Sequence, residues 1–274
     1  MNEEPLPPLR DVIQRHGLGA RKSLGQHYLL DMNLTARIVR AAGDLEGVNA
    51  IEIGPGPGGL TRALLASPAR RIYAVEKDVR CQQAIAELKQ DYGDRLQLIA
   101  GDALKMDLPA LVPAPRKIVA NLPYNVGTPL LIKWLQEIDA YGGLTLMFQT
   151  EVADRLSAVP RTKAYGRLSI ICQWLCAVTS AFNVSREAFT PPPKVASTVV
   201  TLTPRPAPLA PAQWSSLEQV TAAAFGQRRK MLRASLKSLN IDLAAAGVDG
   251  TARAEELSVK EFCALARLHA AGAD

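Results

Sequence analysis

Short apolar runs alternate with amphipathic stretches through most of the chain, and the two patterns predict strands and helices respectively. The apolar runs predict buried strands at Ala50–Ile53, Arg71–Val75, Leu96–Ala100, Lys117–Ala120, Leu144–Phe148, Val178–Val184 and Ser197–Leu202. Apolar positions three or four residues apart predict helices at Asp11–His16, at Leu34–Ala42, after Leu60, and at Val79–Gln90, Thr128–Ile138, Glu151–Ala158 and Arg167–Cys176, the last of which also fits a strand. This alternation predicts the α/β class, with a doubly wound, mostly parallel, Rossmann-like sheet and helices on both faces.

A proline-rich segment, Thr203–Pro211, separates this region from the C-terminal part of the chain. Segments of that composition act as semi-rigid linkers. Beyond it, alanine and leucine predominate and predict helices at Ala212–Phe225, Arg229–Leu239 and Val259–Ala270. We therefore predict two domains, a catalytic domain with an N-terminal arm at residues 1–206 and a small all-helical domain at residues 207–274.

The overall composition is that of a soluble globular protein, with 48% hydrophobic and 21% charged residues in a chain of 274. Its 32 lysines and arginines exceed its 26 acidic residues and give a formal net charge of +6. Such an excess favours a polyanionic partner, although a mildly basic enzyme with a small ligand fits this observation equally well.

The cysteines and histidines are scattered, so neither a metal site nor a disulfide framework is predicted. They are Cys81, Cys172, Cys176, Cys263, His16, His27 and His269. The N-terminus is acidic and lacks the apolar core of a signal peptide, and no apolar run is long enough to span a bilayer. We therefore expect a cytoplasmic protein without a membrane partner.

A glycine-rich turn follows the first predicted strand and precedes a predicted helix, which is the first unit of a nucleotide-binding sheet. Gly54, Gly56 and Gly59 satisfy the dinucleotide pattern G-x-G-x-x-G. Read from Glu52 through Gly54, Gly56 and Gly58, the same stretch resembles motif I of the S-adenosylmethionine (SAM)-dependent methyltransferases. The turn alone leaves both cofactors open.

Two acidic residues end the next predicted strands, where the ligand of a doubly wound sheet binds. Glu76 lies about twenty residues beyond the glycines, the position from which an acid holds ribose hydroxyls. Asp102 can accept a hydrogen bond from an adenine amine, or it can cap a helix that starts at Ala103. Both positions suit an adenosyl cofactor.

The segment Asn121-Leu122-Pro123-Tyr124 ends the fourth predicted strand and discriminates between the cofactors. An adenine amine is a poor nucleophile because its lone pair is delocalised into the ring. The Asn121 side-chain oxygen and the Leu122 carbonyl can accept its hydrogens and favour the tetrahedral geometry that attack on a methyl group requires. Pro123 restricts the direction of that carbonyl, and Tyr124 offers a face on which a base can stack. A hydride-transfer enzyme leaves this segment unexplained.

A basic segment lies in the predicted helical domain. Arg229, Arg233 and Lys237 are spaced to share one face of the predicted helix Arg229–Leu239, beside Arg228 and Lys230. A row of positive side chains suits a nucleic-acid phosphate backbone, although a solvated helix face has the same appearance.

These segments together resemble the bacterial small-subunit ribosomal RNA adenine dimethyltransferase family. The resemblance rests on Lys22–Leu29, Glu52–Thr61, Val75–Asp78, Gly101–Ala103, Asn121–Val126, Phe189–Ala196 and Phe225–Leu236. It implies SAM as cofactor, bound by Gln26, His27, Leu29, Gly54, Gly56, Gly58, Glu76, Lys77, Asp102, Ala103 and Asn121. Phe189 is implied as a second stacking ring opposite Tyr124, and the family usually has Gly-Gln-Asn-Phe-Leu where this chain has Gly25-Gln26-His27-Tyr28-Leu29.

The function implied by the resemblance is dimethylation of the exocyclic amines of two adjacent adenosines near the 3′ end of 16S rRNA in the 30S particle. RNA contacts are expected at Arg228, Arg229, Lys230, Arg233 and Lys237, and a monomer is expected because no exposed heptad or long apolar patch is evident. Two alternatives share the fold: a 23S rRNA or DNA adenine methyltransferase, and a ribosome-assembly factor whose catalysis is secondary.

Overall fold

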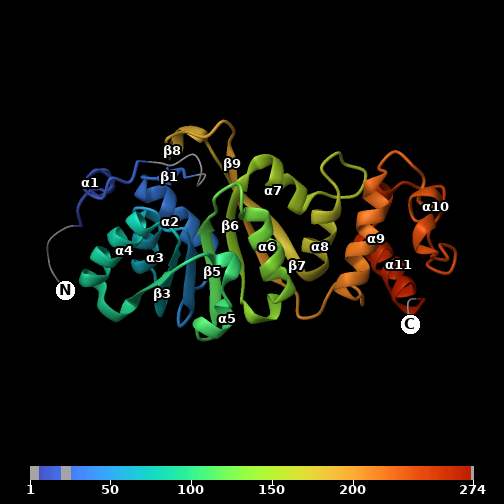
Figure 1. Ribbon diagram of the computed structural model, residues 1–274, viewed down its shortest axis with the longest axis horizontal. Coiled ribbons are helices and arrows are strands. Elements are labelled where there is room, and N and C mark those ends of the chain that lie inside the picture. The colour runs from blue at the N-terminus through green and yellow to red at the C-terminus, as the bar shows by residue number, and fades with distance from the viewer. Residues whose placement is uncertain (1–5, 20–25, 273–274) are drawn as a thin grey trace. The chain divides into compact units, whose positions relative to one another are not determined.

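The computed structural model describes residues 6–19 and 26–272, and its central feature is a sheet of seven strands (Figure 1). The strands lie in the order β4-β3-β2-β5-β6-β9-β7. Their bounds are β2 (Asn49–Ile53), β3 (Arg71–Glu76), β4 (Leu96–Ala100), β5 (Arg116–Asn121), β6 (Leu144–Gln149), β7 (Cys176–Val184) and β9 (Ser197–Pro204). The five strands from β4 to β6 pair in parallel, which confirms the predicted doubly wound, mostly parallel sheet.

The predicted helices of this region form within a few residues of their expected ends. They are α1 (Leu9–Arg15), α2 (Met32–Ala41), α3 (Gly59–Leu65), α4 (Val79–Tyr92), α6 (Gly127–Gln136), α7 (Thr150–Ser157) and α8 (Arg167–Leu175), with a short additional α5 (Leu108–Leu111). Asp31 caps α2, since its carboxylate accepts from the backbone amides of Asn33 and Leu34 at 2.8 and 3.3 Å. The segment that also fitted a strand is the helix α8.

The order of the strands places a topological switch point between β2 and β5. The chain passes from β2 outward to β3 and β4 and then returns to β5 on the other side of β2. A crevice forms at the carboxyl ends of the strands at such a point, and ligands bind there. The register pairs Glu52 with Ala74, two residues before Glu76, and alternation then directs both glutamates to the same face of the sheet.

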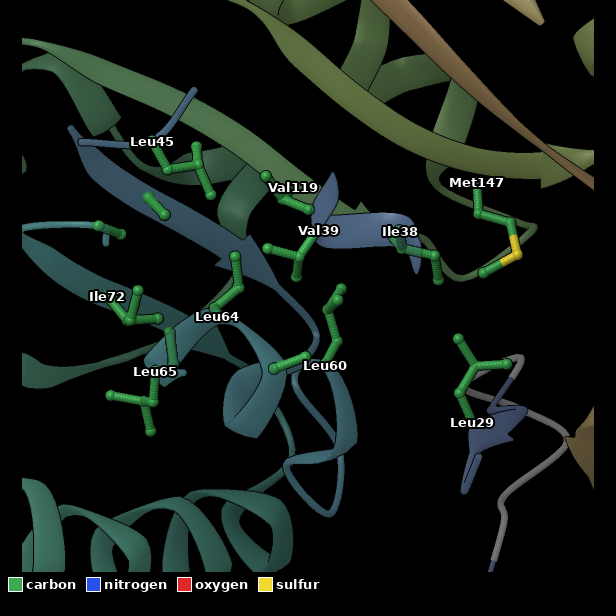
Figure 2. Packing of buried hydrophobic residues seen from close by; sticks show 14 of the residues in the cluster. Leu29, Ile38, Val39, Leu45, Leu60, Leu64, Leu65, Ile72, Val119 and Met147 are labelled. Carbon is green, nitrogen blue, oxygen red and sulfur yellow. The ribbon is translucent and has the colours of Figure 1, made fainter. Parts of the chain in front are cut away.

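A hydrophobic core fixes α2 and α3 on one face of this sheet. Ile38 of α2 and Leu64 of α3 are almost completely buried and belong to one cluster with Ile72 of β3 and Val119 of β5 (Figure 2). Because α3 begins directly after the glycine-rich turn, burial of its leucines also holds that turn over the end of β2.

A two-stranded sheet that the sequence pattern did not predict lies beside the main one. Strands β1 (Tyr28–Leu29) and β8 (Phe189–Thr190) pair antiparallel, with Leu29 opposite Phe189. Each strand has only two residues, too few to show a period of two. This pairing joins the N-terminal motif to the loop that precedes β9.

The described part of the chain divides into two compact units, one formed by residues 6–19, 26–150 and 180–201 and the other by residues 151–179 and 202–272. The second unit contains most of α7, all of α8, and the helices α9 (Trp214–Gly226), α10 (Leu232–Ser235) and α11 (Val259–Ala271). This division differs from the predicted single boundary after residue 206, because residues 151–179 pack with the C-terminal helices.

The predicted helix Arg229–Leu239 is wrong. The residues from Gln227 to Lys230 form a turn, Met231 forms an antiparallel bridge with Arg253, and only the four residues of α10 are α-helical before a 3-10 turn at Lys237–Leu239. Backbone bonds to a distant loop replace the helical ones, since Leu232 N donates to the carbonyl of Ala252 at 2.8 Å. No continuous helix therefore aligns Arg229, Arg233 and Lys237.

Candidate functional site

A cavity of about 230 Å³ opens in the first unit at the carboxyl ends of β2, β3, β4 and β5. The predicted site residues that line it are Gln26, His27, Leu29, Gly54, Gly56, Glu76, Lys77, Asp102, Ala103, Asn121, Leu122, Pro123 and Tyr124. Segments that lie far apart in sequence thus meet around one pocket, as the topology requires. Two of the predicted catalytic and cofactor-binding residues, Gly58 and Phe189, do not line it.

The glycine-rich turn approaches the pocket with bare backbone. Gly54 and Gly56 have φ angles of 69° and 56°, in the left-handed region that favours glycine. A Cβ on Gly56 would lie 2.9 Å from the Tyr28 ring, and one on Gly59 would lie 2.4 Å from the Leu29 carbonyl oxygen. Gly58 instead caps α3 with φ 93° and faces Ile85. The backbone conformation of the turn therefore requires this glycine, which does not line the pocket.

Glu76 ties the glycine-rich turn to the end of β3. Its carboxylate accepts from the backbone amides of Gly56 at 3.2 Å and Asp78 at 2.7 Å. Burial raises the pKa of Glu76, and these amides act in the opposite direction. The carboxylate is thereby oriented at the position from which the sequence predicted a grip on ribose hydroxyls.

Glu52 is a second acidic group of the pocket and was not among the predicted site residues. Its side chain is 1% exposed, and its Oε2 has no hydrogen-bond partner within the described ranges. Burial raises the pKa of Glu52 to about 8, with a further increase from the Glu76 carboxylate and a decrease from Thr61. The signal in the sequence was an acid inside an otherwise apolar strand.

Asp102 both caps a short helix and lines the pocket. Its Oδ1 accepts from Leu104 N at 3.1 Å at the start of the 3-10 turn Ala103–Lys105, while its Oδ2 accepts from Lys77 Nζ at 2.9 Å. The bond from Lys77 lowers the pKa of Asp102, so this carboxylate is ionised at neutral pH. The capping role of Asp102 is confirmed, and its hydrogen bond from an adenine amine stays a prediction.

The lining of the pocket is acidic. Among the described residues that line it, Glu52, Glu76, Asp78 and Asp102 carry carboxyl groups and Lys77 is the one lysine. A dinucleotide pyrophosphate would meet these carboxylates without an arginine to compensate its charge, whereas a cofactor with a positive centre would be attracted. The acidic lining therefore favours a cofactor with a positive centre, as SAM has.

Asn121 ends β5 with its side-chain amide held in one orientation. Nδ2 donates to the His27 carbonyl at 3.1 Å, and Oδ1 accepts no hydrogen bond from any described residue. Pro123 follows in a turn in which its carbonyl accepts from Val126 N and Gly127 N, both at 3.1 Å. The segment thus presents one free side-chain acceptor beside the cavity.

The aromatic partner of Tyr124 is His27 and not Phe189. The imidazole centroid lies 5.4 Å from the Tyr124 ring centroid at an interplanar angle of 30°, and His27 Nδ1 donates to the Pro191 carbonyl at 2.8 Å. Phe189 is 2% exposed, belongs to the hydrophobic core, and meets the His27 ring edge-on at 6.4 Å. Core packing covers the Phe189 ring in this structure, and its expected part in stacking on a base stays a prediction.

Gln26 joins the N-terminal motif to the loop after β3. Its Nε2 donates to Asp78 at 3.1 Å, and Arg80 donates to the same carboxylate at 2.6 Å. The bond from Arg80 lowers the pKa of Asp78 to about 2. The preceding motif residues Lys22–Gly25 lie outside the described residues.

The basic segment of the second unit has two kinds of residue. Arg228 forms structural hydrogen bonds: its guanidinium donates to Glu255 at 2.8 Å and to the carbonyls of Lys163 and Tyr165 at 2.8 and 3.2 Å. Arg229 and Lys230 are exposed and form no ion pair with a described residue. Arg233 and Lys237 are exposed as well.

Residues 6–19 and 26–272 hold neither a candidate metal centre nor a helix that could cross a membrane. No group of three or more histidine, cysteine or acidic side chains in these ranges could hold a metal ion. Among the helices formed by the same residues, none is both long and apolar enough to span a bilayer.

Comparison with known sequences places this pocket in a family context. The sequence model of the family described as "Ribosomal RNA adenine dimethylase" matches residues 17–271. The chain is 61% identical over 265 residues to "Ribosomal RNA small subunit methyltransferase A" of Rhodospirillum rubrum, an alignment that covers 96% of this chain and 92% of that protein. The protein of the same name from Paramagnetospirillum magneticum is also 61% identical, with 96% and 94% covered.

Solved structures show the same fold. A dimethyladenosine transferase from Plasmodium falciparum is similar with a TM-score of 0.76 and 27% identity, over 87% of this chain and 96% of that one. The 23S rRNA methyltransferase ErmE is similar with a TM-score of 0.66 and 25% identity, over 89% of this chain and 99% of that one.

Proposed function

The chain belongs to the ribosomal RNA adenine dimethylase family, and on that premise we propose that it dimethylates the exocyclic amines of two adjacent adenosines near the 3′ end of 16S rRNA. The relatives with 61% identity are named for the small ribosomal subunit, which supports this choice of rRNA. The observation that supports the reaction type is the fixed Asn121 amide, which lines the pocket and whose oxygen accepts no hydrogen bond from a described residue.

S-adenosyl-L-methionine is the methyl donor of this family. Glu76 would hold the ribose, Asp102 the adenine amine, and the backbone of the Gly54–Gly56 turn the amino-acid part. The acidic lining and the glycine positions fit this cofactor. When bound, it supplies a methyl group activated by a sulfonium.

The residues that follow β5 would orient the adenine amine. The Asn121 Oδ1 and the Leu122 carbonyl accept its two hydrogens, and Tyr124 stacks on the base. These acceptors match the ammonium that develops during transfer better than the flat amine, so they lower the barrier. Holding the amine in line with the methyl group lowers the barrier further, because the reacting atoms are already positioned before transfer. The surrounding structure need provide no strong base, because the proton can leave after the methyl group has transferred.

The second unit would bind the RNA backbone. Arg229 and Lys230 are exposed and unpaired within the described part of the chain, and Arg233 and Lys237 extend the set of positive side chains. Arg228 is bonded instead to Glu255 and to the carbonyls of Lys163 and Tyr165. We expect the protein to act in the cytoplasm as a monomer on the 30S particle.

The decisive experiment measures methyl transfer from labelled SAM to 30S particles purified from cells that lack this activity. Nucleoside mass spectrometry would identify the product, and an Asn121→Ala protein would be assayed alongside. We expect dimethyladenosine from the wild type and none from the variant. Unlabelled 30S together with labelled 23S rRNA or DNA would overturn the substrate and leave the chemistry intact.

The similarity to ErmE is the observation that favours the 23S alternative, although the identity of 25% is far below that of the small-subunit relatives. The assembly-factor alternative makes a different prediction. An Asn121→Ala protein that binds 30S particles and still supports their maturation would favour it, because catalysis would then be dispensable.

A further inference from the structure

Glu52 is a buried acid that the proposed transfer reaction leaves without a role. It lies near the carboxyl end of the switch-point strand β2, two residues before Gly54, and it lines the pocket. Its Oε2 has no hydrogen-bond partner within the described ranges. A buried carboxyl oxygen without a partner is costly, so its retention calls for a ligand.

The groups that face Glu52 do not compensate a negative charge. Thr61 on α3 and Glu76 on β3 are the neighbours that act on its carboxyl group, and Glu76 is itself acidic. The lysine of the lining, Lys77, is bound to Asp102, and its side chain is 67% exposed. Arg80 is likewise committed to Asp78. Within the described part of the chain, no cation neutralises Glu52.

The geometry of the parallel strands adds a second acid on the same side. Glu52 pairs with Ala74 in the register of β2 and β3, so Glu76 stands two residues farther toward the carboxyl end on the same face of the sheet. Two buried carboxyl groups in this arrangement oppose each other's ionisation until a positive charge enters the pocket. SAM brings such a charge on its sulfonium and another on its amino group, whereas the demethylated product keeps only the amino group.

We propose that Glu52 is the charge-sensing residue of the cofactor pocket: it is protonated in the cofactor-free protein and gives up that proton to solvent when the cationic methyl donor binds. This inference rests on the cofactor of the proposed function, and it adds that one proton is released when that cofactor binds. Donor affinity then increases with pH, by about tenfold per pH unit where one proton is released per cofactor bound. If the sulfonium is the charge that Glu52 senses, the product S-adenosylhomocysteine, which lacks it, binds less tightly than SAM at the same pH.

Isothermal titration calorimetry of the full-length protein with SAM at pH 7 tests the proposal, in phosphate and in Tris, whose ionisation enthalpies differ. The buffer dependence of the heat gives the number of protons released. We expect close to one proton per cofactor for the wild type and close to none for Glu52→Gln. An unchanged proton number in Glu52→Gln would overturn the inference, since the proton would then come from elsewhere.

Matched variants separate this result from a general loss of binding. Asp102→Asn should bind SAM more weakly but release the wild-type number of protons, because the Asp102 carboxylate is already ionised. Glu52→Asp keeps a carboxyl group and should retain the release, which covers the case in which Glu52→Gln does not fold. Titration with S-adenosylhomocysteine identifies the charge sensed: release with SAM alone assigns it to the sulfonium, and release with both assigns it to the amino group.

Two outcomes would overturn the inference in different ways. Absence of SAM binding at every pH would overturn the proposed cofactor and this inference together. SAM binding without proton release would overturn only the inference.

Discussion

The side-chain amide of Asn121 donates a hydrogen bond to the main-chain carbonyl of His27, with 3.1 Å between Nδ2 and the oxygen. The two residues are 94 positions apart in sequence and meet because the N-terminal motif crosses the carboxyl end of β5. The bond fixes which end of the amide faces the pocket. From the sequence, the N-terminal motif was expected only to bind the cofactor. The bond also connects this motif to the orientation of the substrate amine.

Replacing Asn121 tests this orientation. Asn121→Ala removes the acceptor and should lower the rate of methyl transfer by roughly 10²–10³, as loss of a preorganised hydrogen-bonding group does. Asn121→Asp keeps an oxygen but loses the donor to His27, so we expect a similar loss of rate. Single-turnover transfer to 30S particles, with SAM affinity measured by calorimetry, checks the prediction. Retention of rate in Asn121→Asp would show that the bond to His27 does not orient the amide.

The His27 ring makes a separate prediction, because its imidazole packs against Tyr124 and its Nδ1 is held by the Pro191 carbonyl. His27→Ala keeps the main-chain carbonyl that binds Asn121 but removes the ring. The ring packs against Tyr124, the proposed stacking residue, and a base–aromatic contact is worth about 1–3 kcal/mol. Loss of this support for Tyr124 should therefore increase KM for the 30S particle by up to roughly tenfold while SAM affinity changes less. His27→Phe keeps an aromatic ring and should recover most of the KM. An unaltered KM in His27→Ala would exclude the ring from substrate binding.

Gly59 should tolerate no side chain, although its φ angle is ordinary. A Cβ there would lie 2.4 Å from the carbonyl oxygen of Leu29, which belongs to the short strand β1. Overpacking of this kind costs about 1–3 kcal/mol, so Gly59→Ala should lower Tm and weaken SAM binding. Gly226→Ala is the control, since a Cβ on Gly226 would meet nothing within 4 Å and Tm should stay nearly constant. Equal Tm values for the two variants would contradict the prediction.

The basic residues of the second unit should separate into two groups on substitution. Arg228→Ala leaves the carbonyls of Lys163 and Tyr165 without their donor, and it should reduce stability by about 1–2 kcal/mol. Arg229→Ala and Lys230→Ala should leave Tm unchanged but weaken 30S binding, each reducing the salt-dependence slope by about 1 where a phosphate contact is lost. Thermal unfolding and salt-titrated binding measure the two effects. A reduced salt slope without loss of Tm in Arg228→Ala would reverse its assignment.

The strands and helices of the first unit could be predicted from periodicity because long parallel strands are apolar and their helices are amphipathic. Three features could not. The β1–β8 pair depends on a contact between strands that are distant in sequence, Tyr28–Leu29 and Phe189–Thr190, and neither two-residue strand has a period of its own. The basic segment Arg229–Leu239 has helical spacing, but the bridge between Met231 and Arg253 overrides it. Glu52 could be interpreted as part of a motif, whereas its missing partner is visible only in three dimensions.

The buried Glu52 carboxyl group also predicts how the stability of the free protein depends on pH. Its pKa is about 8 in the folded chain against an ordinary value of 4.5. A group with a raised pKa contributes stability that is fully present below pH 4.5 and is lost as the pH rises to 8. Glu52→Gln carries no charge, so its stability relative to the wild type should increase between about pH 5 and about pH 8, by roughly a few kcal/mol. Chemical denaturation of both proteins at the two pH values measures this difference. A difference that stays constant with pH would mean that Glu52 is ionised throughout, and the pocket would then have to hold that charge without the cofactor.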